Sequence, residues 1–187
     1  MPESGANRAY LSLGSNINPE QNLPAAVRAL AEFGRIEGLS RVWESAPFGT
    51  RPEALSGEPR SEMPQSNGPQ NFLNAAVLLA TDRSAAVLCI EIVPQIEGRL
   101  GRVRDPLDKN APRTIDIDLS LFNRDVLVVG HRHIPDPDIL KRAFVAVPLA
   151  EIDPDYVHPV VGRKLVEIAT ELAAKQALRL RTDVELR

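Results

Sequence analysis

The apolar residues recur with two different periods, and their order along the chain predicts alternating strands and helices. Residues 9–13 alternate in polarity and run into Gly14-Ser15-Asn16, which is typical of a strand that ends in a turn. From Asn22, apolar residues recur at helical spacing as far as Phe33, and Gly34 would end that helix. Segment 36–45 is strand-like, and segment 72–79 has the continuous apolar character of a buried strand.

A similar order follows in the second half of the chain. Ser84 is a favourable N-cap for a helix that carries apolar residues as far as Leu100, with Pro94 expected to kink or split it. Residues 114–121 alternate as a strand does. The further expected elements are a turn at 123–125, a short strand at 126–129, a turn or single helical turn at 135–142, an apolar segment at 144–149, and an amphipathic helix at about 163–176.

Two successive β-α-β patterns predict an α+β fold, namely a ferredoxin-like sandwich in which helices pack on a mainly antiparallel sheet. The 187 residues fit one domain over 1–187. Five of the 16 prolines fall between residues 46 and 70, so we expect a long loop there. Long loops are often lids over active sites. A tolerated surface insertion explains this composition equally well.

Composition and charge exclude several classes of protein. Hydrophobic residues make up 43% and charged residues 25% of the chain, which is typical of a globular protein. The net charge of −3 argues against a nucleic-acid partner, and no apolar run reaches the length of a membrane span. One cysteine, Cys89, and an N-terminus without a signal-like apolar segment fit a reducing compartment. We expect a cytoplasmic monomer without nucleic-acid or membrane partners.

The most specific chemical feature is the segment Pro112-Arg113-Thr114-Ile115-Asp116-Ile117-Asp118. On a strand, Asp116 and Asp118 share one face while the isoleucines occupy the other. Two adjacent carboxylates repel unless a cation lies between them, and Mg²⁺ accepts such hard oxygen ligands together with phosphate. The alternative is a solvent-facing strand edge that carries two charges.

A cluster of cations precedes this segment, formed by Arg99, Arg102, Arg104, Lys109 and Arg113. Guanidinium groups bind phosphate through paired hydrogen bonds. The alternative is a solvated helix end whose cations favour the helix dipole. The neighbouring acidic pair favours the phosphate interpretation, because phosphoryl transfer needs both metal ions and cations.

Other candidates stay open when the residues are considered alone. His131 and His133 alternate on one strand and suit either a surface or a ligand contact. Phe72 and Phe144 are core residues by default, and Cys89 falls in an apolar helix that favours packing over nucleophilic chemistry. The chain contains neither a P-loop motif nor a G-x-S-x-G motif.

Taken in order, several motifs resemble the 6-hydroxymethyl-7,8-dihydropterin pyrophosphokinase family over about residues 9–160. They are Gly14-Ser15-Asn16, Phe72-Leu73-Asn74-Ala75-Ala76, Glu97, Gly101-Arg102-Val103-Arg104, Pro112 to Asp118, and Arg142-Ala143-Phe144. The resemblance implies a ferredoxin-like fold and transfer of diphosphate from ATP to the pterin hydroxymethyl group, with AMP as the second product. It also implies Mg²⁺, with two ions held by Asp116 and Asp118.

The resemblance further implies roles for individual residues of this chain. The catalytic residues would be Arg102, Arg113, Asp116 and Asp118. The pterin-binding residues would be Ser45, Ala46, Phe48, Phe72, Asn74 and Phe144. The ATP-binding residues would be Glu97, Arg104, Leu119, His131, His133 and Arg142.

One departure from the family pattern concerns the nucleotide side of the site. Members commonly carry Pro-His where this chain has Pro135-Asp136, and an ionised carboxylate cannot donate a hydrogen bond to phosphate. His133 is a candidate to replace that donor. Two rival functions also remain, a palm-like nucleotidyl transferase or cyclase and a ferredoxin-like RNA-binding or regulatory module. The low aromatic content of 4% disfavours the second.

Overall fold

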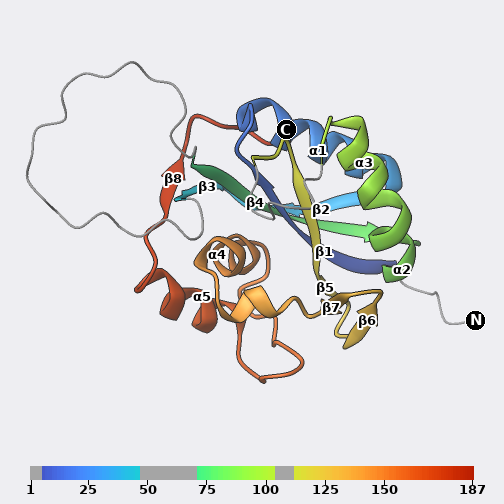
Figure 1. The fold of residues 1–187 in the computed structure, drawn as a ribbon. Coiled ribbons are helices and arrows are strands. Elements are labelled where there is room, and N and C mark those ends of the chain that lie inside the picture. Colours follow the sequence, from blue (N-terminus) through green and yellow to red (C-terminus); the bar gives the residue numbers. More distant parts are fainter. Residues whose placement is uncertain (1–5, 47–70, 104–111) are drawn as a thin grey trace, which may run out of the picture.

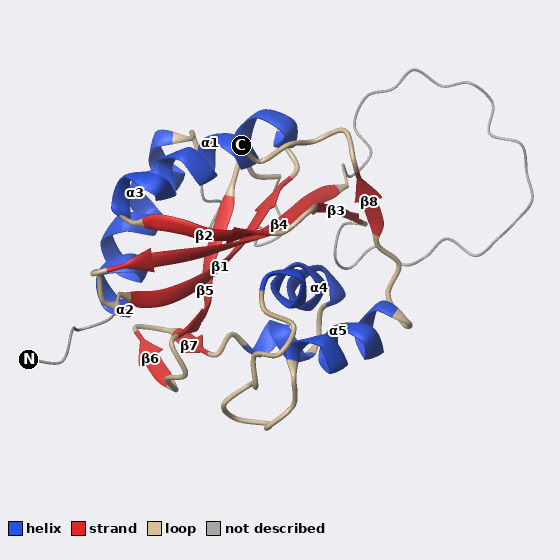
Figure 2. Cartoon of the chain, turned by 180° about the vertical axis from the view of Figure 1, so that it is seen from behind, coloured by secondary structure: helices blue, strands red, loops and turns tan. Residues whose placement is uncertain are grey.

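The computed structural model describes residues 6–46, 71–103 and 112–187. Its centre is a six-stranded sheet with helices on both faces (Figures 1 and 2). The sheet order is β5-β1-β4-β3-β8, and β2 pairs with β4 beside β3. Each of these pairings among the described residues is antiparallel. The strands are β1 (Asn7–Ser15), β2 (Arg35–Leu39), β3 (Val42–Ser45), β4 (Phe72–Thr81), β5 (Asp116–Phe122) and β8 (Arg179–Arg181). A separate hairpin pairs β6 (Leu127–Val129) with β7 (Arg132–Ile134).

Two hydrophobic cores lie on opposite faces of the sheet. The first packs Leu11 and Val77 against α1 (Pro19–Leu30), α2 (Ala85–Val87) and α3 (Val93–Arg99). The second packs Tyr10 and Leu78 against α4 (Ala143–Ile152) and α5 (Leu165–Ala173). Because both faces are covered, every residue of β4 after the first is buried, which explains why its sequence is continuously apolar.

The antiparallel sheet with packed helices is as predicted, but the second helical layer was not anticipated. The predicted strand at 36–45 is two strands, β2 and β3, separated at Ser40-Arg41. There the Ser40 hydroxyl accepts a hydrogen bond from the backbone N–H of Ala76 at 2.8 Å, in place of a regular ladder contact. The strand on which His131 and His133 were expected to alternate corresponds to β7, whereas β8 escaped prediction because three residues carry too little periodicity.

The predicted helix from Ser84 is confirmed, and so is its interruption near Pro94. The Ser84 hydroxyl accepts from the backbone N–H of Val87 at 3.3 Å, as an N-cap does. A π-helical turn, η2 (Leu88–Ile92), separates α2 from α3 just before Pro94. A wider turn accommodates the proline, which has no N–H and whose ring crowds the preceding turn.

The residues after α5 return to the far side of the sheet. The strand β8 pairs with β3, and Val184 and Leu186 then bury their side chains in the first core. Two further short turns complete the described structure, a 3₁₀ turn at Ala31–Phe33 and another, η3, at Pro137–Leu140. Of the helices in the described ranges, none combines the length and apolarity that a membrane span requires.

Two glycines provide a test of the close contact between the end of α1 and β4. A Cβ at Gly34 would lie 2.3 Å from the carbonyl oxygen of Ala80, whereas one at Gly98 in α3 would meet nothing within 4 Å. We expect Gly34→Ala to lower the free energy of unfolding by about 1–3 kcal/mol through overpacking. The control Gly98→Ala should raise it by up to ~1 kcal/mol, because alanine favours helix. Urea denaturation measures both, and equal effects would contradict the close approach.

Candidate active site

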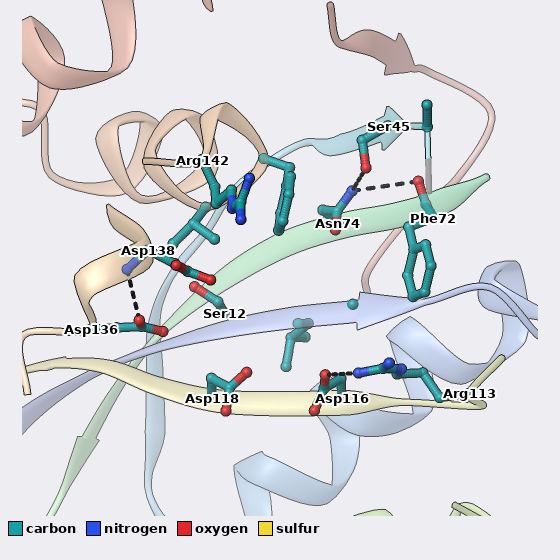
Figure 3. Close-up of a pocket in the computed structure, with 15 residues that line it drawn as sticks. Ser12, Ser45, Phe72, Asn74, Arg113, Asp116, Asp118, Asp136, Asp138 and Arg142 are labelled. Atoms are coloured by element: carbon teal, nitrogen blue, oxygen red, sulfur yellow. Dashed lines mark hydrogen bonds and ion pairs between the residues drawn. The ribbon is translucent and has the colours of Figure 1, made fainter. Parts of the chain in front are cut away.

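A cavity of about 250 Å³ opens on the sheet face that α4 covers (Figure 3). Strands β1, β3, β4 and β5 supply its floor, and η3 and α4 supply the opposite wall. The lining residues are Ser12, Leu13, Gly14, Ser45, Ala46, Phe72, Asn74, Arg113, Asp116, Asp118, Asp136, Asp138, Arg142, Phe144 and Val145.

Alternation along β5 brings Asp116 and Asp118 to the cavity side by side (Figure 3). Ile115 and Ile117 are fully buried on the other face. The strand lies at the edge of the sheet, yet its carboxylates face the cavity and are only partly exposed, by 24% for Asp116 and 43% for Asp118. The carboxylates thus lie on an edge strand, as the alternative interpretation expected, but they face a cavity rather than open solvent.

Two arginines form ion pairs with Asp116. Arg102 donates to its Oδ1, and Arg113 donates from Nη1 to its Oδ2 at 2.6 Å. Burial alone would raise the pKa of Asp116, but the two guanidinium groups outweigh it and hold that pKa below its usual value. The Asp116 side chain is thus an anion bound on both oxygens.

A helix C-cap places Arg102 beneath Asp116. Gly101 has a φ of 74°, and the backbone N–H of Arg102 donates to the carbonyl of Glu97 at 2.9 Å, as in a Schellman motif. The Glu97 side chain is 2% exposed, accepts from Arg102, and also accepts from the backbone N–H of Ile117 at 2.9 Å. One buried carboxylate therefore holds both the arginine and the strand that carries Asp116.

The end of β1 places Arg113. The Asn16 side chain accepts from the backbone N–H of Arg113 at 2.7 Å, and the Ser15 hydroxyl donates to the carbonyl of Thr114 at 2.5 Å. The Arg113 guanidinium lies 5.7 Å from the ring centroid of Phe72, within range of a cation–π contact. The sequence segments 14–16 and 112–118 are therefore one structural unit.

Asp118 lies in a more acidic environment than Asp116. Burial and the nearby charges of Asp116 and Asp136 raise its pKa to about 6, although Arg132 pairs with its Oδ1 and works in the opposite direction. Burial also raises the pKa of Asp136, whose Oδ1 accepts from the backbone N–H of Asp138 at 2.9 Å. This end of the cavity would be stabilised by additional positive charge.

The other end of the cavity combines aromatic rings with a fixed amide. Phe72 of β4 and Phe144 of α4 both line it. The buried Asn74 donates from Nδ2 to Ser45 Oγ at 3.0 Å (Figure 3). Its Nδ2 also donates to the carbonyl of Trp43 at 3.2 Å. Because the protein uses these N–H groups, the amide carbonyl is the part of Asn74 that remains to accept from a ligand.

The donor set fits a magnesium ion rather than a closed metal centre. Among the described residues, no group of three or more histidines, cysteines or carboxylates gathers at one point. Mg²⁺ commonly takes only one or two carboxylates and completes its shell with water and phosphate oxygens. Asp116 and Asp118 meet that requirement.

Comparison with known proteins identifies the family of this chain. The sequence model of 7,8-dihydro-6-hydroxymethylpterin-pyrophosphokinase (HPPK) matches residues 10–154. The chain belongs to this family. It is 31% identical over 167 residues to the Aquifex aeolicus 2-amino-4-hydroxy-6-hydroxymethyldihydropteridine pyrophosphokinase, covering 89% of this chain and 92% of that one. The Bacillus subtilis protein of the same name is 34% identical over 149 residues, 78% of each chain.

Some proteins to which this chain is similar are much longer. The chain spans 21% of the Dictyostelium discoideum folic acid synthesis protein FOL1, to which it is 30% identical over 159 residues. A crystal structure of Plasmodium falciparum HPPK-DHPS superimposes with a TM-score of 0.67 at 16% identity, over 93% of this chain and 46% of that one. That likeness concerns the fold.

The cavity collects most, but not all, of the residues that the HPPK resemblance singled out. Ser45, Ala46, Phe72, Asn74, Arg113, Asp116, Asp118, Arg142 and Phe144 all line it. Phe48 and Arg104 lie outside the described residues, as does Lys109. Glu97 and Arg102 stand behind Asp116 rather than in the lining.

Three expected nucleotide-side residues lie elsewhere. Leu119 is 3% exposed and its side chain belongs to the first core, so that side chain does not face the cavity. His131 and His133 are exposed on the β6–β7 hairpin and are not among the lining residues. Which side chains of this hairpin face the cavity depends on how the hairpin packs against the sheet, and the local sequence does not encode that packing.

The structure also adds residues that sequence reasoning missed. They are Ser12, Leu13, Asp138 and Val145 in the lining, and Arg132 at Asp118. Asp136, which the sequence marked as a departure from the family pattern, also lines the cavity. The sequence does contain a signal for Ser12, because a polar residue between the apolar Leu11 and Leu13 faces the opposite side of the strand from them. Its hydroxyl lies 2.7 Å from that of Ser120, beside the register partner Asp118.

The raised pKa of Asp118 predicts a pH-dependent stability difference. Its folded-state pKa of about 6 exceeds its usual value of 3.8, so the folded protein binds an extra proton between those pH values. Asp118 therefore favours folding more at pH 4 than at pH 7. We expect the unfolding temperature of Asp118→Asn relative to wild type to rise from pH 4.5 to pH 7.5.

Calorimetry on the ligand-free proteins measures this difference. The control is Asp82→Asn, which removes an aspartate whose side chain is 83% exposed. A difference for Asp118→Asn that stays constant across this pH range would contradict the assigned environment.

Proposed function

We propose that this chain transfers the β,γ-diphosphate of ATP to the hydroxymethyl oxygen of 6-hydroxymethyl-7,8-dihydropterin. The products are AMP and the pterin diphosphate used in folate biosynthesis. The observation that carries the proposal is one cavity with an aromatic and amide end and an acid–arginine end. Membership of the HPPK family and the names of the relatives support it.

The aromatic end suits a flat heterocycle. Rings bind favourably when stacked against aromatic side chains, and Phe72 and Phe144 enter the cavity from different elements. The carbonyl of Asn74 would accept a hydrogen bond from the amino edge of the pterin. Ser45 and Ala46, at the end of β3, line the same end.

The acid–arginine end suits the triphosphate. Asp116 and Asp118 would hold two Mg²⁺ ions, and these would neutralise the charge of the phosphate oxygens. Arg113, which already faces the cavity, would stabilise charge that develops on the oxygen bridging the α- and β-phosphates. Arg102 keeps Asp116 ionised and oriented from behind. Arg142 lines the wall and would contact the nucleotide.

The transfer requires attack at the β-phosphorus. The hydroxymethyl oxygen forms the new P–O bond, the bond to the α-phosphate oxygen breaks, and AMP leaves with that oxygen. The hydroxyl proton passes to solvent. What the chain contributes is positioning, exclusion of water by the aromatic wall, and positive charge at the breaking bond.

The fold and setting form part of the same proposal. The order β5-β1-β4-β2, with α1 after β1 and α3 before β5, supports a ferredoxin-like core extended by β8, α4 and α5. We expect one domain over 1–187 that acts as a cytoplasmic monomer.

The identity of the nucleotide product tests this function. The protein is incubated with ATP, Mg²⁺ and 6-hydroxymethyl-7,8-dihydropterin, and the nucleotides are separated by chromatography. AMP that forms only when pterin is present, together with pterin diphosphate, supports the proposal. ADP would indicate γ-phosphoryl transfer, and released diphosphate would indicate a nucleotidyl transferase.

Asp116→Asn tests the role of the two cavity carboxylates, Asp116 and Asp118. We expect turnover to fall to less than a tenth of wild type, a loss of more than ~1.4 kcal/mol of transition-state stabilisation. Circular dichroism should show an intact fold, and Asp82→Asn is the matched control with unchanged turnover. A variant that keeps more than a tenth of the activity would argue strongly against a metal-binding role.

Arg113→Ala separates transition-state stabilisation from binding. We expect kcat to fall by about 100-fold, comparable to the loss of one oxyanion donor, with a much smaller change in pterin affinity. Steady-state kinetics and pterin titration give the two numbers. Weaker pterin binding with an unchanged kcat would show that Arg113 acts only in ground-state binding.

A further inference from the structure

Arg132 is placed at the candidate site although no motif in the sequence marked it. It lies on β7, outside the main sheet, and its Nη1 donates to Oδ1 of Asp118. Its side chain is 19% exposed, whereas that of Asp118 is 43% exposed, so the arginine is the more enclosed partner of the ion pair. Among the described residues, Arg132 is the one cationic side chain that forms an ion pair with Asp118.

The surroundings make this cation important for the charge balance. Arg132 also lowers the pKa of the neighbouring carboxyl of Asp136, while Asp116 and Asp136 both act to raise the pKa of Asp118. Asp116 already has two arginine partners of its own. Arg132 is therefore a guanidinium whose charge acts on both carboxylates at this end of the cavity.

A guanidinium and a divalent cation cannot share one carboxylate without mutual repulsion. A cation that binds Asp118 must weaken the pair with Arg132, because like charges at contact distance repel strongly in a partly enclosed site. The phosphate oxygens that arrive with the cation are then the nearest strong acceptors. A guanidinium binds phosphate as readily as it binds carboxylate, through paired N–H donors.

We propose that Arg132 is the counter-ion of Asp118 while the site is empty and a phosphate ligand once nucleotide and divalent cation are bound. This inference rests on the proposed function for the nature of its anionic ligand. It also assigns the missing phosphate donor near Asp136 to Arg132 rather than to His133, which is exposed on the opposite face of the same strand.

The two roles of Arg132 give opposite effects when its charge is removed. Without nucleotide, Arg132 competes with a divalent cation for Asp118, so its loss should strengthen cation binding. With nucleotide, its loss removes a phosphate contact and should weaken binding. A residue that only supports the hairpin would weaken both, because a loosened site binds neither ligand better.

The experiment compares Arg132→Gln and Arg132→Lys with wild type and with Arg35→Gln. Arg35 lies on β2 away from the cavity, with a side chain that is 78% exposed, and is the matched control. The probes are Mn²⁺ alone, followed by electron paramagnetic resonance, and Mg²⁺ with a non-hydrolysable ATP analogue, followed by calorimetry. Both are used at pH 8, where the carboxylates are ionised.

We expect Arg132→Gln to bind Mn²⁺ alone several-fold more tightly than wild type. The same variant should bind the Mg²⁺–nucleotide analogue about tenfold more weakly, which corresponds to ~1.4 kcal/mol. Arg132→Lys keeps the charge but loses the fork of N–H donors, so it should bind Mn²⁺ nearly as wild type does and show an intermediate loss for the nucleotide. Arg35→Gln should change neither value.

Each contrary result overturns a defined statement. Weaker or unchanged Mn²⁺ binding by Arg132→Gln would refute the counter-ion role, and unchanged nucleotide binding would refute the phosphate role. If Arg132→Gln does not fold, the phosphate role is tested with Arg132→Lys instead. Wild-type nucleotide affinity in Arg132→Lys would then refute the phosphate role. A wild-type protein that does not bind the Mg²⁺–nucleotide analogue would instead refute the proposed function, and the Mn²⁺ measurement would still test the counter-ion role.

Discussion

Asp116 and Asp118, which are separated by one residue on β5, repel each other. Much of the surrounding structure positions the cations that offset this repulsion. Arg102 and Arg113 bind Asp116, and Arg132 binds Asp118. Each arginine comes from a different element, namely the cap after α3, the segment that leads into β5, and the β6–β7 hairpin. Positioning these three groups requires α3, the end of β1 and the hairpin to pack where they do.

The two-sided burial of the sheet provides the rigidity that this arrangement needs. The first core fixes α3, and with it Glu97, against β5, so that a buried anion can stand behind Arg102. The second core fixes α4, which carries Phe144, over the opposite end of the cavity. The polar end and the aromatic end are thus set by different layers that share one sheet.

Sequence reasoning was most successful where local geometry decides the outcome. Strand alternation placed Asp116 and Asp118 on one face, and the Ser84 cap and the break near Pro94 followed from backbone chemistry. It was less successful where distant segments meet. The pair between Arg132 and Asp118 joins residues 14 apart through a hairpin whose short strands have little periodicity, so no local signal distinguished Arg132 from the neighbouring histidines.

The route of the chain after α5 has a consequence for how the protein is made. Val184 and Leu186 fill the first core, which otherwise consists of segments that are synthesised much earlier. β8 likewise completes the sheet edge beside β3, where Arg181 reaches Glu20 of α1. During synthesis, the first core therefore stays incomplete, and the outer edge of β3 stays unpaired, until this late segment leaves the ribosome. Such non-local closure slows folding and exposes apolar surface to aggregation meanwhile.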